Sequence, residues 1–516
     1  MPTHKPIVYW KPLLLLAGIK LFIHFISYNT YGLHRDEYLY LSESDHLSWG
    51  YMEVPPMIAL IGKLARLLFG DTPFAVKVFP ALIGAISILI IGALTAEMGG
   101  KKRAQVLAAT CFLLSPAFLG SNSLFQPVSF NQFCWLLSAF WVTRLFHGGS
   151  PNNWYYLGIT AGLGFLTKYS ITFFFAALVI GFLLTKQRKA FLSKYPWIAA
   201  GIALLIALPN LIWQYQYDFP VVRHMKDLAA TQLVHVEPAD FLLTQLLFHG
   251  AVVLVWLVGL FALLFWKPLQ SFRVLGLAYL AVLLLLLGFS GKDYYTLGSY
   301  SMLFAAGAVR WEDWLGWKTW FFLPAILILN LPIIPYGLPI LPIEKMKAYC
   351  AYMRDHAGLE ALLRWEDGIV RELPQDYADM HGWTEIPEKV ARLYHSLSPE
   401  EQKSCMIYAG HYGQAGVLNF YRKKYNLPEA YSLNSSFVMW APEYIEFDRQ
   451  IQVDDYPQDS SIYFEQVILM DSIEHPLARD PGYIYYKTEP KIDLTKAWRD
   501  NWLEARKEAG YFIRGN

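Results

Sequence analysis

The stretch that decides the fold is residues 35–82, RDEYLYLSESDHLSWGYMEVPPMIALIGKLARLLFGDTPFAVKVFPAL, which follows one apolar segment at 12–29 and runs into another at 74–97. Inside it, residues 36–48 and 57–69 carry apolar side chains at helical spacing, and the pair Pro55-Pro56 interrupts the pattern between them. The loop is therefore predicted to form two short amphipathic helices that lie on a membrane surface.

The composition indicates a polytopic α-helical membrane protein. Of 516 residues, 55% are hydrophobic and only 16% are charged, against roughly 25% charged residues in soluble proteins. A membrane-spanning helix needs about 20 mainly apolar residues. The clearest candidates are 12–29, 74–97, 104–121, 128–146, 196–213, 241–266, 274–289 and 319–337. We expect two short helices from 154–185, which is too long for one span and contains Lys168, and a further span at 297–310, which brings the total to about eleven.

The charge distribution divides the chain near Lys345. Of the 42 acidic residues 15 precede Lys345, whereas 23 of the 43 basic residues do, so the tail is acidic. An acidic soluble part argues against nucleic-acid binding. We predict a transmembrane domain at 1–344 and a soluble α/β domain at 345–516, because an apolar run at 466–470 alternates with helical patterns at 388–397 and 496–508. Gly413 and Gly416 are expected at a tight turn between a strand and a helix.

The basic clusters predict the orientation. Residues 101–103 and 186–189 are the loops richest in Lys and Arg, and such loops stay in the cytoplasm. With eleven spans, the loop at 30–73, the turn at Lys168, the loop at 214–240, the stretch around Lys292 and the tail all fall on the outer side. The unusual polar motifs would then share one aqueous face.

Asp36 and Glu37 have two interpretations. Both stand at the start of a short helix, beside His34 and Arg35, and acidic residues in a first turn stabilise a helix through its dipole. Alternatively, one of them is a general base that accepts a proton from a hydroxyl group.

The remaining polar candidates also have two interpretations each. Glu53 is either a solvated loop residue or a second carboxylate of the site. Lys168 and Lys292 stand between apolar segments with aromatic neighbours. They either extend to the membrane interface or bind a lipid phosphate as cations. Arg223 and His224 add positive or titratable groups on the same side.

The first loop resembles the GT-C glycosyltransferases of the family 39 type, the group of protein mannosyltransferases and aminoarabinose transferases, in its bacterial branch. GFLTKYS at 164–170, GKDYYTLGSYSMLFAAGA at 291–308 and HYGQAGVLNFYRKKYNLP at 411–428 extend the resemblance. Val54 departs from the aminoarabinose branch, which has lysine there, and residues 125–128 lack an aspartate that many relatives have. These departures leave the donor sugar and the acceptor open.

The resemblance implies an inverting glycosyltransferase of the bacterial cytoplasmic (inner) membrane that moves a sugar from a polyprenyl-phosphate donor to a glycan, lipid or protein acceptor on the outer face. It implies Asp36 as the catalytic carboxylate with Glu37 in support. The implied substrate-binding residues are Arg35, Glu53, Lys168, Arg223, His224, Lys292, Tyr294 and Tyr295. No cofactor is certain, and a divalent metal is left open with Glu53 and His224 as candidate ligands.

A transporter or flippase of a lipid-linked saccharide is the alternative, since the same residues would bind such a substrate without chemistry. Transporters often show internal repeats and broken helices near the membrane midplane. The sequence shows no such repeat, and its polar motifs gather in outer loops. This distribution favours the enzyme.

Overall fold

The computed structural model describes residues 6–147, 150–231, 233–235, 237–458 and 460–510, and the chain divides into two compact units. The first unit comprises the described residues of Met1–Tyr28, Lys77–Pro209 and Ala230–Leu341. The second comprises those of Asn29–Val76, Asn210–Ala229 and Pro342–Asn516. The loop between the first two apolar helices therefore groups with the tail and not with the helices that flank it in sequence.

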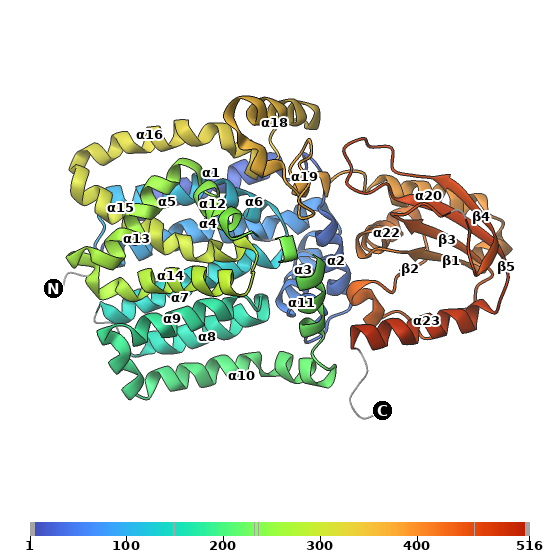
Figure 1. Cartoon of the computed structure of the whole chain (residues 1–516), viewed down its shortest axis with the longest axis horizontal. Coiled ribbons are helices and arrows are strands. Elements are labelled where there is room, and N and C mark those ends of the chain that lie inside the picture. The colour runs from blue at the N-terminus through green and yellow to red at the C-terminus, as the bar shows by residue number, and fades with distance from the viewer. Residues whose placement is uncertain (1–5, 148–149, 232, 236, 459, 511–516) are drawn as a thin grey trace. The chain divides into compact units, whose positions relative to one another are not determined.

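The first unit is a helical bundle in which α7, α8, α9 and α14 run side by side (Figure 1). Two of its helices, α4 and α10, extend into the second unit. Its helices are α1 (Trp10–Ser27), α4 (Pro73–Glu97), α5 (Lys102–Leu114), α6 (Pro116–Ser123), α7 (Pro127–Phe146), α8 (Asn152–Thr167), α9 (Ile171–Leu183), α10 (Tyr195–Gln216), α12 (Pro238–Leu247), α13 (Val253–Phe265), α14 (Arg273–Gly288), α15 (Tyr300–Leu315), α16 (Thr319–Asn330) and α17 (Ile334–Gly337).

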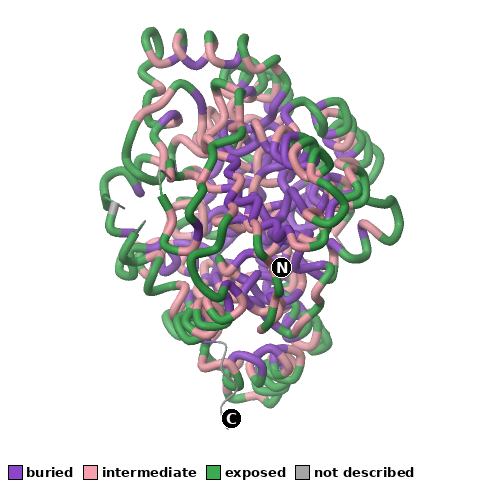
Figure 2. Tube along the Cα trace, turned by 90° about the vertical axis from the view of Figure 1, so that its right-hand side faces the viewer, coloured by how far each residue is buried: buried purple, intermediate pink, exposed green. Residues whose placement is uncertain are grey.

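Many of these helices expose large apolar side chains, as helices that face lipid do. Figure 2 colours the chain by burial, with buried residues in purple and exposed residues in green. On α1 and α10, Phe22 is 63% exposed and Leu205 is 70% exposed. In the described part of the chain, five helical stretches are long and apolar enough to cross a membrane, or up to eight if each bent pair is one span. The membrane class is confirmed, and the total of eleven spans stays a prediction.

The expected spans at 104–121 and 241–266 are broken helices. The first separates into α5 and α6 with a bend of 61°, and the second into α12 and the segment ending with α13 with a bend of 95°. Pro116 causes the first break, because proline lacks an N–H and disfavours helical backbone at the residue before it. At the second break Gly250 has φ +54°, a left-handed conformation that favours glycine. The predicted division of 154–185 is correct, since α8 ends at Thr167 and α9 begins at Ile171.

The second unit combines the first loop with an α/β tail. The two short helices expected in the loop are present as α2 (Arg35–Asp45) and α3 (Met57–Phe69). The other helices are α11 (Pro220–Thr231), α18 (Ile343–Ala357), α19 (Gln375–Ala378), α20 (Glu385–Ser396), α21 (Pro399–Lys403), α22 (Tyr412–Tyr425) and α23 (Leu494–Ala509). The strands are β1 (Cys405–Ala409), β2 (Ala430–Tyr431), β3 (Arg449–Asp454), β4 (Phe464–Asp471) and β5 (Tyr483–Pro490).

The five strands form one mixed sheet in the order β2-β1-β3-β5-β4. Strand β1 pairs in parallel with β2 and β3, whereas β5 pairs antiparallel with β3 and β4. Helices α20 and α22 cover one face and α23 lies against the other (Figure 1). Ile451 and Val453 of the central strand β3 are buried on one face, and Gln450 and Gln452 are buried on the other, as expected of a strand covered on both faces. The small α/β domain expected in the tail is confirmed.

Helix α22 of the tail packs directly against α2 of the first loop. A Cβ atom on Gly416 would lie 2.8 Å from both Cβ and the carbonyl oxygen of Tyr38, so only glycine permits this approach. The expectation that Gly413 and Gly416 form a strand-to-helix turn is wrong, because both lie inside α22 and the turn falls at Gly410 and His411. The glycine is needed for helix packing.

Candidate active site

The first turn of α2 is fixed by a capping box. The Nδ1 atom of His34 accepts a hydrogen bond of 3.1 Å from the backbone N–H of Asp36, and the carboxylate of Glu37 accepts one of 2.7 Å from the backbone N–H of His34. Glu37 is fully buried. The capping interpretation therefore describes Glu37, and its role at the site is to hold the start of α2 in place.

Asp36 remains partly accessible, with a side chain that is 28% exposed. The phenolic O–H of Tyr412 in the tail donates a hydrogen bond of 2.7 Å to Oδ1 of Asp36. His34 Nδ1 lies 3.9 Å from the second oxygen, and Arg35 Nε lies 3.8 Å from the first. Burial raises the pKa of Asp36, but the charges of His34 and Arg35 and the bond from Tyr412 outweigh it, so the net pKa is lowered. The carboxylate is ionised and oriented.

Arg35 is anchored by a buried carboxylate of the tail. Its backbone N–H donates a bond of 3.1 Å to the carbonyl oxygen of Asp379, and its Nε lies 3.5 Å from the Asp379 carboxylate. Arg479 donates two bonds of 3.0 and 3.2 Å to the same carboxylate, which is 1% exposed. Burial raises the pKa of Asp379, but His34 and the two arginines lower it by a larger amount, so the net pKa is lowered. Arg35, Asp379 and Arg479 thus form a cluster of paired charges next to Asp36.

His34 responds to opposing influences. Burial lowers its pKa, whereas the charges of Asp36, Asp379 and Asp376 raise it, with a net value of about 9. A fully protonated ring carries hydrogen on Nδ1, so protonation competes with the capping bond that Nδ1 accepts. The carboxylates favour the charged ring and the helix cap favours the neutral one.

Glu53 does not project freely from its turn. Its carboxylate accepts hydrogen bonds from the hydroxyls of Ser435 and Ser436 and one of 3.1 Å from the backbone N–H of Ser436. The Ser436 hydroxyl also accepts a bond of 3.0 Å from the backbone N–H of Met52. Glu53 therefore fastens the first loop to the short helix η9 (Ser435–Met439) of the tail.

Arg223 is engaged elsewhere in the second unit. Its guanidinium forms an ion pair of 2.7 Å with Asp218 and donates to the carbonyl oxygens of Lys507 and Glu508. Those carbonyls belong to the last turn of α23, where a cation is favourable. His224 is half-buried on α11.

The first unit brings together four of the predicted substrate-binding residues. The Nζ atom of Lys168 lies 4.9 Å from the ring centre of Tyr295 and 5.1 Å from that of Tyr294. The Nζ atom of Lys292 lies 5.9 Å from the Tyr294 ring. Lys168 and Lys292, which are about 120 residues apart in sequence, thus both place their ammonium groups near the Tyr294–Tyr295 pair. The distances from the ammonium groups to the ring centres are in the range of cation–π interactions.

Candidate metal ligands do not assemble in the described residues, where no group of three His, Cys, Asp or Glu side chains is placed to hold a metal ion. The oxygens of Glu53 accept bonds from serine donors. Glu53 and His224 are therefore not assigned to a metal.

Several residues of the site were not singled out from the sequence. Asp379 and Arg479 carry no local motif, and Tyr412 stands in the segment HYGQAG, which contributed to the family resemblance without a role of its own. Ser435 and Ser436 read as ordinary loop residues. Only the packing of α22 on α2 brings Tyr412 to Asp36.

Comparison with known proteins supports the expected resemblance. Residues 53–213 match the family model for dolichyl-phosphate-mannose-protein mannosyltransferase. Lipid A galacturonosyltransferase RgtD of Rhizobium johnstonii is 28% identical over 42% of this chain and 46% of its own length. The undecaprenyl phosphate-alpha-4-amino-4-deoxy-L-arabinose arabinosyl transferase of Pseudomonas savastanoi is 24% identical over 38% of this chain and 39% of its own. The chain thus spans less than half the length of these two relatives.

The fold has a solved counterpart. The crystal structure of ArnT from Cupriavidus metallidurans bound to undecaprenyl phosphate superposes with a TM-score of 0.63 at 14% identity, covering 92% of this chain and 97% of that chain. Its apo form superposes with a TM-score of 0.57 at 15% identity and the same coverage. The chain therefore has this fold of helical membrane unit and soluble tail.

Proposed function

We propose that the protein is an inverting glycosyltransferase that moves a sugar from a polyprenyl-phosphate donor to an acceptor hydroxyl. The observation that carries the proposal is the partly exposed carboxylate of Asp36 at the start of α2, which accepts a hydrogen bond of 2.7 Å from Tyr412. The ArnT fold and the two relatives named for sugar transfer support it. The relatives transfer different sugars, so the donor sugar is left to experiment.

In the proposed reaction Asp36 accepts the proton of the acceptor hydroxyl as its oxygen attacks the anomeric carbon. The bond from that carbon to the phosphate oxygen breaks on the opposite side, and the configuration inverts. A carboxylate with a lowered pKa is a weak base for a free alcohol. The transition state has oxocarbenium character, so the hydroxyl proton becomes acidic as the new bond forms and is transferred late.

Lys168 and Lys292 are proposed to bind the donor phosphate. Negative charge grows on the phosphate as the sugar leaves, and fixed cations stabilise such charge. Both ammonium groups lie against the Tyr294 and Tyr295 pair. Arg223 is omitted, because Asp218 and the end of α23 already engage it.

The proposed topology places residues 1–344 as the catalytic membrane domain and 345–516 as an extracytoplasmic domain of the bacterial inner membrane. The acceptor would be a glycan, lipid or protein on the outer face. Tail residues Tyr412, Asp379 and Arg479 complete the surroundings of Asp36. Transfer on the outer face therefore requires the tail on that face as well.

A panel of radiolabelled polyprenyl-phosphate sugars tests the proposal. Purified protein in lipid nanodiscs would be incubated with each donor and a membrane-glycolipid extract as acceptor, and label would be followed into the acceptor. We expect transfer from at least one donor, with inversion at the anomeric carbon by NMR of the product. Movement of intact donor across vesicles with no transfer from any donor would instead identify a flippase.

A further inference from the structure

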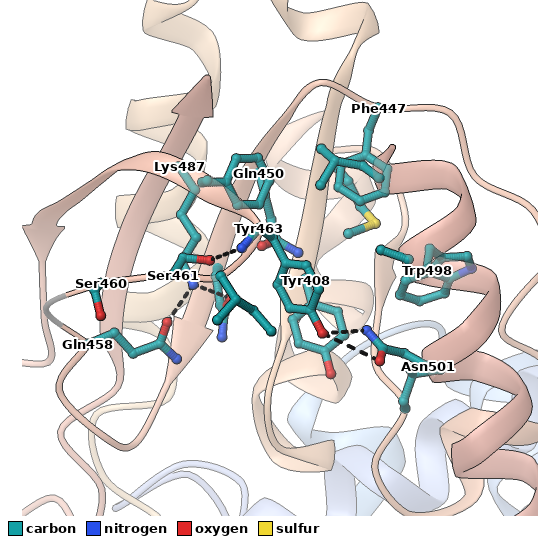
Figure 3. A pocket seen from close by; sticks show the side chains of 17 residues that line it. Tyr408, Phe447, Gln450, Gln458, Ser460, Ser461, Tyr463, Lys487, Trp498 and Asn501 are labelled. Atoms are coloured by element: carbon teal, nitrogen blue, oxygen red, sulfur yellow. Dashed lines mark hydrogen bonds between the residues drawn. The ribbon is translucent and has the colours of Figure 1, made fainter. Parts of the chain in front are cut away.

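The tail contains a cavity of about 390 Å³ between the sheet and α23 (Figure 3). Its wall is formed by β1, β3 and β5 on one side, by α23 on the other, and by described residues of the loop that leads into β4. The volume is within the range of about 300–1,000 Å³ that small-molecule sites occupy. All of its lining belongs to the second unit.

Aromatic rings form part of the lining, and those of Tyr408, Tyr463 and Trp498 carry a polar group. Tyr408, Phe447, Tyr463 and Trp498 all border the cavity. Trp498 is anchored by a bond of 2.9 Å from its Nε1–H to the carbonyl oxygen of Pro442, and the Tyr463 hydroxyl accepts one of 3.1 Å from the Asn501 amide. Aromatic rings that are fixed by hydrogen bonds and lie beside hydroxyl and amide groups suit a pyranose ring, which has apolar C–H faces and hydroxyl groups around its edge.

Gln450 offers a buried amide to a ligand. Its side chain lines the cavity and is only 8% exposed. Within the described part of the chain, this amide has no hydrogen-bond partner among the protein side chains, and its two N–H donors and one carbonyl acceptor are not among the groups closed off from solvent. The amide therefore faces the space of the cavity, where a ligand hydroxyl would take the place of water.

Lys487 is the only charged side chain among the described lining residues. It is 4% exposed, and its Nζ donates a bond of 2.7 Å to Oε1 of Gln452 and another to Oε1 of Gln458. The amide nitrogens of both glutamines donate 2.8 Å bonds to Asp454, which is not part of the lining. Burial lowers the pKa of Lys487 to about 8, although Asp454 opposes this effect. The cation faces the cavity, and its balancing carboxylate lies behind the two amides.

We propose that this cavity binds a sugar unit that carries a carboxylate or phosphate group, with the anion at Lys487 and a hydroxyl at Gln450. The rings of Tyr408 and Trp498 would contact the apolar faces of the sugar. A lysine has three N–H donors, and two of those of Lys487 are used by glutamine oxygens. The inference is independent of the transfer reaction proposed above.

Ligand-observed NMR on the full chain in nanodiscs tests the site with three probes: methyl glucuronide, glucose 6-phosphate and methyl glucoside. We expect saturation transfer to at least one anionic probe, and roughly ten-fold weaker binding of the neutral glucoside, as for loss of one charge-assisted contact. Whether glucuronide or phosphate binds better identifies the anion. Equal binding of the neutral probe, or no binding of either anionic probe, would overturn the proposal.

Two substitutions locate the binding. Lys487→Met removes the cation, and Gln450→Leu removes an amide that no described residue satisfies, so the second change should leave folding intact. Each substitution should weaken binding of the anionic probe roughly ten-fold. Lys496→Met is the matched control, because Lys496 is exposed on α23 and outside the cavity. Circular dichroism would verify folding. Unchanged binding in both folded variants would place the probe elsewhere and refute the assignment.

Discussion

The hydroxyl of Tyr412 donates a hydrogen bond of 2.7 Å to Oδ1 of Asp36, across 376 positions of sequence. Asp36 belongs to the first loop and Tyr412 to the first turn of α22 in the tail. The soluble tail is therefore part of the surroundings of the candidate catalytic carboxylate.

Asp36→Asn should lower the turnover rate by about 10²- to 10⁴-fold, the usual contribution of a positioned general base. Asparagine is nearly isosteric and still accepts the bond from Tyr412, so folding and donor binding should persist. Initial rates with an authentic donor measure the effect. Asp45→Asn is the matched control, since Asp45 ends the same helix and is 47% exposed. Near-parental transfer by Asp36→Asn would remove Asp36 from the catalytic role.

Tyr412→Phe should shift the acid limb of the pH–rate profile to higher pH. The hydrogen bond from Tyr412 helps to lower the pKa of Asp36, so its loss raises that pKa and activity disappears sooner as the pH falls. The rate at neutral pH should drop about ten-fold, because the carboxylate loses a charge-assisted bond that orients it. Tyr425→Phe, at the other end of α22, should leave the profile unchanged. An unaltered acid limb in Tyr412→Phe would show that this bond does not tune Asp36.

Lys168→Met and Lys292→Met keep most of the stem and remove the cation. Donor binding should weaken by about 1.5 to 3 kcal/mol for each, as for a hydrogen bond to a charged group. Equilibrium binding of a fluorescent polyprenyl phosphate in nanodiscs measures this. Lys189→Met, on an exposed residue of a different loop, serves as the control. If both variants bind as well as the parent, the lysines are interface anchors and the phosphate assignment fails.

A cysteine at position 423 should react with a membrane-impermeant maleimide on intact cells. Lys423 has a side chain that is 83% exposed, and all four native cysteines are buried, which keeps the background low. A cysteine in place of Lys189, in a loop predicted to be cytoplasmic, should react only after the membrane is opened. The reverse pattern would invert the topology and place the candidate site in the cytoplasm.

Much of the fold could be predicted from the sequence because its signals are local. The apolar runs, the Pro55-Pro56 break and the division at Lys168 appear in the structure as α1, α2, α3, α8 and α9. The breaks in the expected spans at 104–121 and 241–266 were missed. Each depends on a single proline or glycine within an otherwise continuous apolar run. A hydropathy value averaged over a window hardly changes with one such residue, whereas that residue is enough to break the helix.

The sequence by itself determined the membrane class and the two short helices of the first loop, since composition and periodicity are properties of short segments. It also led to the proposal of Asp36, through the first-loop motif. The tertiary structure alone decided which carboxylates are engaged. Glu37 caps α2, and Glu53 accepts hydrogen bonds from Ser435 and Ser436. Asp36 accepts a hydrogen bond from Tyr412. The physical reason is that hydrogen-bond partners 376 and 383 positions away are chosen by packing. That packing requires the close contact of α2 with Gly416 of α22, which no local pattern reveals.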